Sequence, residues 1–260
     1  MIGRIWTAYL IELAKAVRTK TTYVGPVLML AAVVATAAYR IRQGQALDFS
    51  FIAFATSASL AVPGLLLVLT FCAGLIASEL HSGTIRMLLI RPIRRSELLV
   101  AKWCLGFTYA VVLLGVVALS AWIGAWTTGG AAGVTLGGEV VYTQVEMERA
   151  YLYGMALSLF PMAAAVAYAI LISTLLPSPG PALATTVGSW LLIDLIKYPL
   201  HVQTYLFWTF WSTPWQPFRD FCDGLPADWM NGLIACLVTA ILTTLICLSA
   251  SVLVLRRRNV

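Results

Sequence analysis

Two charged residues, Asp194 and Lys197, stand in an otherwise apolar stretch of the chain. Their spacing of three places both on one face of a helix, where opposite charges can pair. Charges at membrane depth are costly and often belong to an ion or substrate path. Lys197 could equally extend toward the external membrane surface with Asp194 as its counter-ion. Two interpretations therefore stay open: a substrate path or gate, and a structural ion pair.

Residue types that carry hydrolytic or metal chemistry are sparse. His81 and His201 are far apart in the chain, and neither HExxH nor GxSxG occurs. No GxxxxGK[ST] phosphate loop is present either. All cysteines except Cys222 lie in apolar blocks, where a small packing residue is the ordinary role. We expect no catalytic residue, no metal site and no cofactor bound by this chain.

The segment from Ser78 to Lys102, SELHSGTIRMLLIRPIRRSELLVAK, separates two apolar blocks. Gly83 allows a tight turn, residues 84–90 can form two helical turns with an apolar patch, and Pro92 ends that helix. This pattern predicts a short rigid helix across one membrane face, able to transmit force from a partner into the bundle. An ordinary basic loop would explain the arginines, but not the turn, patch and stop together.

Membrane helices have to position these residues. The chain has 260 residues, of which 60% are hydrophobic and 11% charged, whereas soluble domains contain about 25% charged residues. Its apolar blocks are long enough to cross a bilayer as helices and lack the alternation of barrel strands. We expect one domain over residues 1–260, an all-α integral membrane protein. An amphipathic helix at 3–20 lies in the membrane interface, and six spans follow, at 22–39, 51–77, 98–126, 151–176, 182–200 and 230–255.

Three features interrupt the apolar blocks. Pro63 and Gly64 predict a kink in the second span. Residues 127–149 are glycine-rich and then acidic, which is typical of an external loop. Residues 201–229 combine many aromatic side chains with three prolines, and we expect them to dip into the outer membrane interface, where Trp and Tyr are enriched.

The distribution of cations predicts the orientation. Most of the 17 lysines and arginines fall on one side of the membrane if both termini are cytoplasmic, as the positive-inside rule requires. Basic residues flank apolar blocks instead of forming a stripe on a polar surface. The net charge of +6 therefore indicates contact with membrane lipid and no nucleic-acid binding.

The segment between the second and third expected spans resembles the matching loop of ABC-2-type ABC transporter permeases. The interfacial helix, the six spans, the kinked second span and the excursion between the fifth and sixth spans extend the likeness. The resemblance implies an ABC-2 exporter-like (type V) bundle. It also implies that residues 78–97 form a coupling helix docking on a separate ATPase subunit. The residues that match the family pattern and would carry this coupling are Glu79, Gly83, Thr84, Arg86, Leu88, Leu89, Pro92 and Arg95.

The same resemblance implies a function for the chain. It would be the permease subunit of an ATP-driven exporter of an amphipathic, lipid-like, peptide or drug-like substrate, in the plasma (inner) membrane of a prokaryote. Its partners would be an ATP-binding cassette ATPase, which binds ATP and Mg, and a second permease copy, most simply as a homodimer. The alternative is an ion-coupled secondary transporter that uses Asp194 and Lys197. An intramembrane enzyme is disfavoured because no cluster of catalytic groups is visible.

Overall fold

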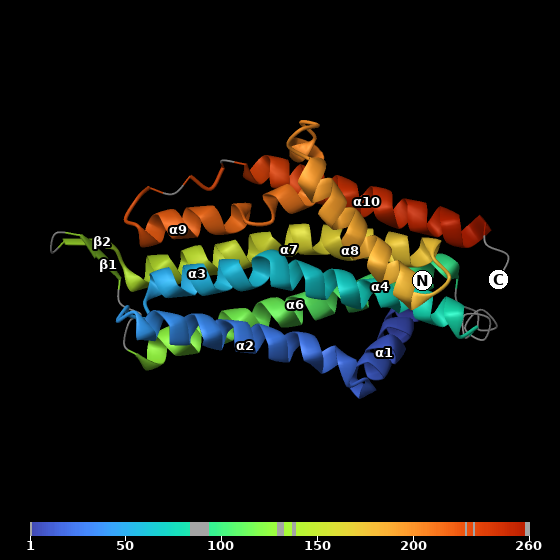
Figure 1. The fold of residues 1–260 in the computed structure, drawn as a ribbon, viewed down its shortest axis with the longest axis horizontal. Helices are drawn as coiled ribbons and strands as arrows, with labels where there is room; N and C mark the ends of the chain where they lie inside the picture. Colours follow the sequence, from blue (N-terminus) through green and yellow to red (C-terminus); the bar gives the residue numbers. More distant parts are fainter. Residues whose placement is uncertain are drawn as a thin grey trace.

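The computed structural model describes residues 2–83, 94–128, 133–136, 139–226, 228–230 and 232–257. Long helices dominate these residues (Figure 1). Five helical segments among them are long and apolar enough to cross a membrane. They are α2 (Thr21–Arg42), the continuous run of α3 (Phe49–Ser59), η1 (Leu60–Gly64) and α4 (Leu65–His81), α6 (Arg95–Thr127), α7 (Gln144–Leu175) and α10 (Leu233–Arg257).

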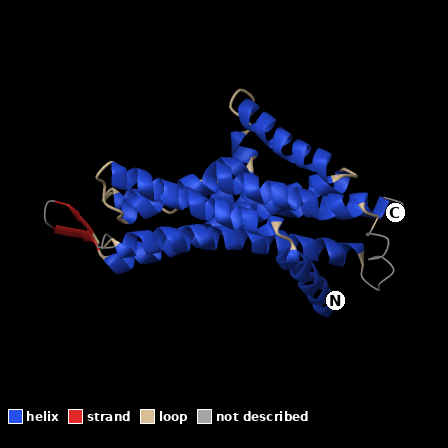
Figure 2. Ribbon diagram, turned by 60° about the horizontal axis from the view of Figure 1, so that its bottom comes forward, coloured by secondary structure: helices blue, strands red, loops and turns tan. Residues whose placement is uncertain are grey.

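The long helices lie side by side along the long axis of the molecule, and both ends of the chain lie at the same end of the bundle (Figures 1 and 2). The core forms where α3, α4, α6 and α7 face one another. Phe51 and Leu69 from the second span, Leu113 from α6 and Ile170 from α7 are completely buried there. Elsewhere on these helices large apolar side chains remain exposed, as expected for surfaces that contact lipid.

The amphipathic N-terminal segment forms α1 (Ile2–Arg18), which packs on α6 at an angle to the bundle (Figure 2). Its inner face buries Ala8 and Glu12, and its outer face leaves Trp6 59% exposed. The hydroxyl of Tyr9 lies 2.9 Å from the hydroxyl of Thr108 on α6. α1 is therefore attached to the third span by polar contacts as well as by packing.

The predicted irregularity around Pro63 is present as the π-helical turn η1. Proline has no N–H to donate within a helix, and π-turns are a recognised way to absorb such a break. The indole N–H of Trp211 donates to the carbonyl of Leu60 at 2.7 Å. One helical turn before η1, Ser57 accepts a hydrogen bond from Arg219. The segment after α8 thus holds the irregular turn from outside the second span.

Five of the six expected spans have a counterpart among the five candidate segments, and the fifth expected span, at 182–200, is the exception. Residues 179–196 form α8 (Pro179–Ile196), which has 18 residues and is not among the five segments that meet the criteria for a span. Pro179, Gly180 and Pro181 occupy its first turn and Asp194 its last, so its apolar stretch is short. Figure 1 shows that α8 crosses α7 obliquely and ends well short of the hairpin end of the bundle.

The loop expected at residues 127–149 contains regular structure. Strands β1 (Val134–Leu136) and β2 (Glu139–Tyr142) pair antiparallel as a hairpin. α7 begins at Gln144, before the expected start of the fourth span, because Thr143 and Glu146 form a capping box. The first turns of α7 are polar, so hydrophobicity alone marked them as loop.

The aromatic segment, which the sequence predicts to dip into the outer membrane interface, packs against the bundle. It folds into η2 (Gln203–Tyr205), η3 (Phe207–Phe210), η4 (Thr213–Trp215) and α9 (Gln216–Cys222), which contact α3, α7 and α10. Pro214 and Pro217 lie in the first turns of η4 and α9, where a helix tolerates the missing N–H. The aromatic side chains that this fold buries are Phe207, Trp208, Trp211, Trp215 and Phe218.

Candidate functional site

Four charged residues from three helices meet at the end of the bundle where the chain termini lie. Lys102 of α6 lies at the centre, with its Nζ 3.0 Å from Glu12 Oε2 of α1 and 3.0 Å from Glu79 Oε2 of α4. Lys15 lies 2.7 Å from Glu12 Oε1 and 3.3 Å from Glu79 Oε1. We call these four residues the ion cluster.

Lys102 is almost inaccessible, with 1% of its surface exposed. A lysine ammonium has three protons to donate, and three oxygen atoms surround it: one from Glu12, one from Glu79 and the backbone carbonyl of Leu75 at 3.0 Å. A buried ion pair adds little net stability, but removing one partner is strongly destabilising because the other charge stays buried. The cluster therefore holds α1, α4 and α6 in one relative arrangement.

The positive charges of Lys102 and Lys15 lower the pKa of the buried Glu12 carboxyl. Burial opposes ionisation of this carboxyl, but attraction to Lys102 and hydrogen bonds from both lysines outweigh it, so the pKa of Glu12 lies below its usual value. Burial likewise opposes the charge on Lys15, but its contacts with Glu12 and Glu79 raise the pKa of the ammonium. Both residues are therefore charged at neutral pH.

A second contact fixes the end of α4 against α7. The hydroxyl of Ser173 on α7 donates to the carbonyl of Ala73 at 2.7 Å and accepts from the backbone N–H groups of Ile76 and Ala77 at 3.1 and 3.0 Å. These groups lie one turn before Glu79. The carboxylate of Glu79 is thus carried on a helix end that is held from two sides.

The predicted coupling segment is described only at its two ends. Glu79 lies in the ion cluster, Gly83 adopts a φ of 69°, and Arg95 begins α6 and donates to the carbonyl of Leu255. The positive φ explains the glycine, since other residues rarely adopt it. The remaining predicted coupling residues lie outside the described residues: Thr84, Arg86, Leu88, Leu89 and Pro92.

The start of α6 carries its own cap. The carboxylate of Glu97 accepts a hydrogen bond from the backbone N–H of Arg94 at 2.9 Å, which satisfies one of the donors left free at a helix start. Glu97 is 4% exposed. Both ends of the segment at 84–93 are therefore firmly positioned.

A cavity of about 710 Å³ adjoins the ion cluster. It lies among α1, α2, α4, α6 and α8, with Glu12, Glu79 and Lys102 on its wall together with several Thr and Ser hydroxyls. Lys15 and Tyr109 also line it, and its apolar side chains include Phe71 and Leu105. Such a wall offers charged, hydrogen-bonding and hydrocarbon contacts to one molecule.

Asp194 and Lys197 do form an ion pair, with Lys197 Nζ 2.6 Å from Asp194 Oδ1. The ammonium also lies 5.0 Å from the ring centre of Tyr198. The Lys197 side chain is 10% exposed and that of Asp194 is 42% exposed. The pair lies at the C-terminal end of α8, with Asp194 in its last turn and Lys197 at its C-cap.

The family follows from the sequence match across these elements. The sequence model of the ABC-2 family transporter proteins matches residues 9–189, from α1 into α8. The chain belongs to this family. None of the curated proteins matches the sequence. Residues 190–260, including the aromatic segment and α10, lie beyond the family match.

Membership in the ABC-2 family confirms the resemblance seen in the sequence. The protein is a multi-pass membrane protein, and its family is one of membrane subunits that are typically not catalytic and that imply an ATPase partner. In the part of the chain that the structure describes, no three His, Cys, Asp or Glu side chains are grouped as metal ligands.

Glu79, expected at the start of the coupling segment, lies in the last turn of α4. Its partners in the structure are Lys102 and Lys15. The ion cluster as a whole was missed. The available signal was Lys102, a single charge in the apolar run LLVAKWCLG, because a charge there needs a partner of opposite sign.

Proposed function

We propose that the chain is the membrane-spanning permease subunit of an ATP-driven exporter. A separate ATP-binding cassette ATPase, carrying ATP and Mg, docks on residues 78–97. The termini and this segment face the cytoplasm of a prokaryotic cell, across its plasma (inner) membrane. The ABC-2 family membership supports the class, and the ion cluster supports the site of coupling.

The observation that carries the coupling proposal is the position of the ion cluster on both sides of residues 84–93. Glu79 precedes that segment and Lys102 follows it. Lys102 forms ion pairs with both Glu79 and Glu12, and so links the two flanks to α1. A displacement of the segment by an ATPase would therefore move α1, α4 and α6 together. Without such contacts, each flank could move independently and the force would be lost.

The test is co-purification of the tagged protein in mild detergent, with mass spectrometry of the proteins that accompany it. Wild type is compared with a variant in which Arg86, Leu88 and Leu89 are changed to Asp. The matched control is Val140→Asp with Val141→Asp, since these hairpin side chains are 62% and 40% exposed at the opposite end. We expect a P-loop ATPase with wild type and control, and its loss from the segment variant. Equal recovery in all three would reject the docking site.

We further propose that the cavity beside the ion cluster belongs to the substrate path. Its mixture of charges, hydroxyls and hydrocarbon suits an amphipathic substrate such as a lipid-like molecule, peptide or drug. A second copy would cover the outer face of α8, where Leu191, Leu192 and Leu195 are 54%, 60% and 76% exposed. Asp194 and Lys197 would then line or close the path between the two copies.

Ion-coupled transport remains the competing proposal because Asp194 is partly exposed and paired at the end of α8. The two proposals differ in their energy source. Vesicles with the protein alone, without ATP, are placed on a solid-supported membrane and given a sodium or proton gradient. We expect no protein-dependent charge movement. A current that disappears in Asp194→Asn would favour the ion-coupled transporter.

A further inference from the structure

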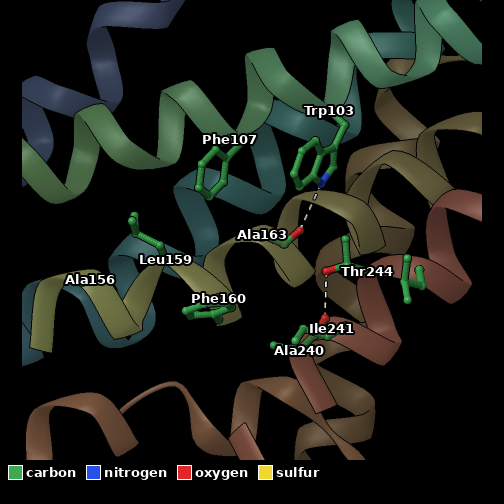
Figure 3. Close-up of a pocket in the computed structure, with 10 residues that line it drawn as sticks. Trp103, Phe107, Ala156, Leu159, Phe160, Ala163, Ala240, Ile241 and Thr244 are labelled. Carbon is green, nitrogen blue, oxygen red and sulfur yellow. Dashed lines mark hydrogen bonds between the residues drawn. The ribbon is translucent and has the colours of Figure 1, made fainter. Parts of the chain in front are cut away.

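A second, separate groove of about 530 Å³ lies between α6, α7 and α10 (Figure 3). Trp103 and Phe107 project from α6 on one side, Leu159 and Phe160 belong to α7, and Ile241 belongs to α10. The groove shares no lining residue with the cavity beside the ion cluster. Its volume falls in the range of pockets that enclose small molecules, roughly 300–1,000 Å³.

The wall of the groove is mostly hydrocarbon. Its two polar side-chain groups, those of Trp103 and Thr244, already donate hydrogen bonds within the protein. The indole N–H of Trp103 donates to the carbonyl of Ala163 at 3.3 Å, and the hydroxyl of Thr244 donates to the carbonyl of Ala240 at 2.8 Å (Figure 3). Apolar cavities of this kind do not retain water. A hydrocarbon chain is the occupant that such a wall favours.

The rim of the groove faces the surroundings of the bundle. Phe160, Ile241 and Leu245 line it and are 39%, 47% and 58% exposed. The three helices that form it are all candidate membrane spans. The groove therefore opens sideways onto the hydrocarbon of the bilayer, from which lipid chains can enter.

Cationic side chains lie at a suitable distance along α10. Arg256 and Arg257 are exposed in its last turn, and α6 begins beside them because Arg95 contacts the carbonyl of Leu255. At 1.5 Å per residue, Thr244 lies about 18 Å from Arg256. Half of the hydrocarbon core is about 15 Å thick, so a chain anchored at the arginines reaches the groove. Arginines at this level attract anionic lipid headgroups.

We propose that the groove between α6, α7 and α10 binds one acyl chain of an anionic phospholipid whose phosphate lies at Arg256 and Arg257. The lipid belongs to the leaflet at the arginine-bearing end, which the orientation proposed above makes the cytoplasmic one. Such a lipid would hold α10 against α6 and α7. The site is distinct from the substrate path proposed above and does not depend on the ATPase.

The test uses quenching of Trp103 by lipids brominated in the middle of the acyl chain. The full-length protein is reconstituted in phosphatidylcholine vesicles with increasing brominated phosphatidylglycerol or brominated phosphatidylcholine. Each variant is measured with and without Trp103→Phe, so the difference reports Trp103 alone. Ala156→Phe places a ring in the groove, since Ala156 lines it and is exposed. Leu242→Phe is the matched control, because Leu242 is 52% exposed on α10 and does not line the groove.

We expect half-maximal quenching of Trp103 at a mole fraction about fivefold lower for phosphatidylglycerol than for phosphatidylcholine. Arg256→Gln with Arg257→Gln should remove that difference, whereas Arg18→Gln, an exposed cation on α1, should preserve it. Ala156→Phe should abolish the quenching and Leu242→Phe should not. Equal quenching by both lipids in the wild type, or unchanged quenching in Ala156→Phe, would overturn the proposal.

Discussion

Lys102 shows how a charged residue is accommodated inside an apolar helix. Its ammonium donates to the carboxylate of Glu12 and to the carbonyl of Leu75, and it forms an ion pair with the carboxylate of Glu79. The arrangement depends on all partners being present at once. Removing the central cation, Lys102, should therefore lower the free energy of unfolding much more than removing the peripheral cation, Lys15.

We predict that Lys102→Met lowers the free energy of unfolding by about 3–5 kcal/mol, because Glu12 and Glu79 keep buried charges without their main partner. The measurement is the unfolding midpoint of the purified protein in detergent. Adding Glu12→Gln and Glu79→Gln to this variant should recover much of the loss. Lys15→Met is the control, because the Lys15 side chain is 51% exposed and such pairs contribute about 0–1 kcal/mol. Equal losses in the two lysine variants would contradict the central role of Lys102.

Glu12 gives the fold a defined dependence on acid. The pKa of its carboxyl is lower in the folded protein than its usual value near 4.5, so the folded state binds this proton less tightly than the unfolded state. The stabilisation is fully present above pH 4.5 and is lost as the pH falls through the folded-state pKa. We predict that wild type unfolds at a higher temperature than Glu12→Gln near neutral pH, and that the difference shrinks below about pH 4.5. A difference that grows in acid would contradict this sign.

At the scale of elements, the second span is held at its irregular turn by the segment that follows α8. Trp211 and Arg219 both donate to this span, at Leu60 and Ser57. The contact joins the only π-helical turn that the described residues contain to the aromatic segment. A change in the bend of the second span would therefore either break these hydrogen bonds or move the aromatic segment together with the span.

We predict that Trp211→Phe destabilises the protein by about 1–3 kcal/mol, because the buried carbonyl of Leu60 loses its indole donor. Hydrogen exchange should rise in peptides that cover residues 57–65. Trp208→Phe is the matched control. Trp208 is similarly buried, at 8% against 7% exposed, and among the described residues its indole nitrogen has no hydrogen-bond partner. If both variants exchange alike, the hydrogen bond is not what holds the turn.

Most of the membrane helices can be predicted from the sequence, because a bilayer requires long, uncharged helices. The residues at which these helices begin and end are predicted less accurately. α7 begins within a polar stretch because Thr143 and Glu146 cap it, and α8 is shorter than the fifth expected span. Hydrophobicity reports where a chain can meet lipid, and not where a helix begins or ends.

The site was predicted in part for a related reason. Glu79 and the turn at Gly83 belong to a local pattern, whereas Glu12 and Lys102 meet across 90 residues of sequence. The glycines of α6 show the same limit. A Cβ at Gly106 would lie 2.7 Å from atoms of Cys72 and Val166, while one at Gly115 would meet nothing within 4 Å. The sequence alone does not distinguish these two glycines, because the difference lies in tertiary packing.

At the scale of the molecule, the bundle is polarised along its long axis. The chain ends and the ion cluster lie at one end and the hairpin at the other (Figures 1 and 2). α8 stands out from one side and leaves apolar side chains uncovered. This uneven side surface is what the proposed second copy would complete.

We predict that Leu195→Cys, in a background without the native cysteines, forms a disulfide between two copies in membranes under mild oxidation. Leu195 is 76% exposed on α8. Leu119→Cys is the control, since Leu119 is 65% exposed on α6, a helix that is not among the main packing partners of α8. Gel mobility without reductant measures the outcome. Cross-linking of Leu119→Cys but not Leu195→Cys would place the contact between copies elsewhere.

The early end of α8 has an electrical consequence. Irregular backbone follows Ile196 part-way along the bundle (Figure 1), and inside a bilayer such backbone has to be covered by protein or water. If water reaches this irregular backbone, the part of the protein that separates the two aqueous sides is only the stretch between Asp194 and the arginine-bearing end of the bundle. The membrane voltage would fall across that stretch, at about 2.3 kcal/mol per elementary charge for each 100 mV. A charged cargo arriving at Asp194 from that end would have crossed most of the field after only part of the distance.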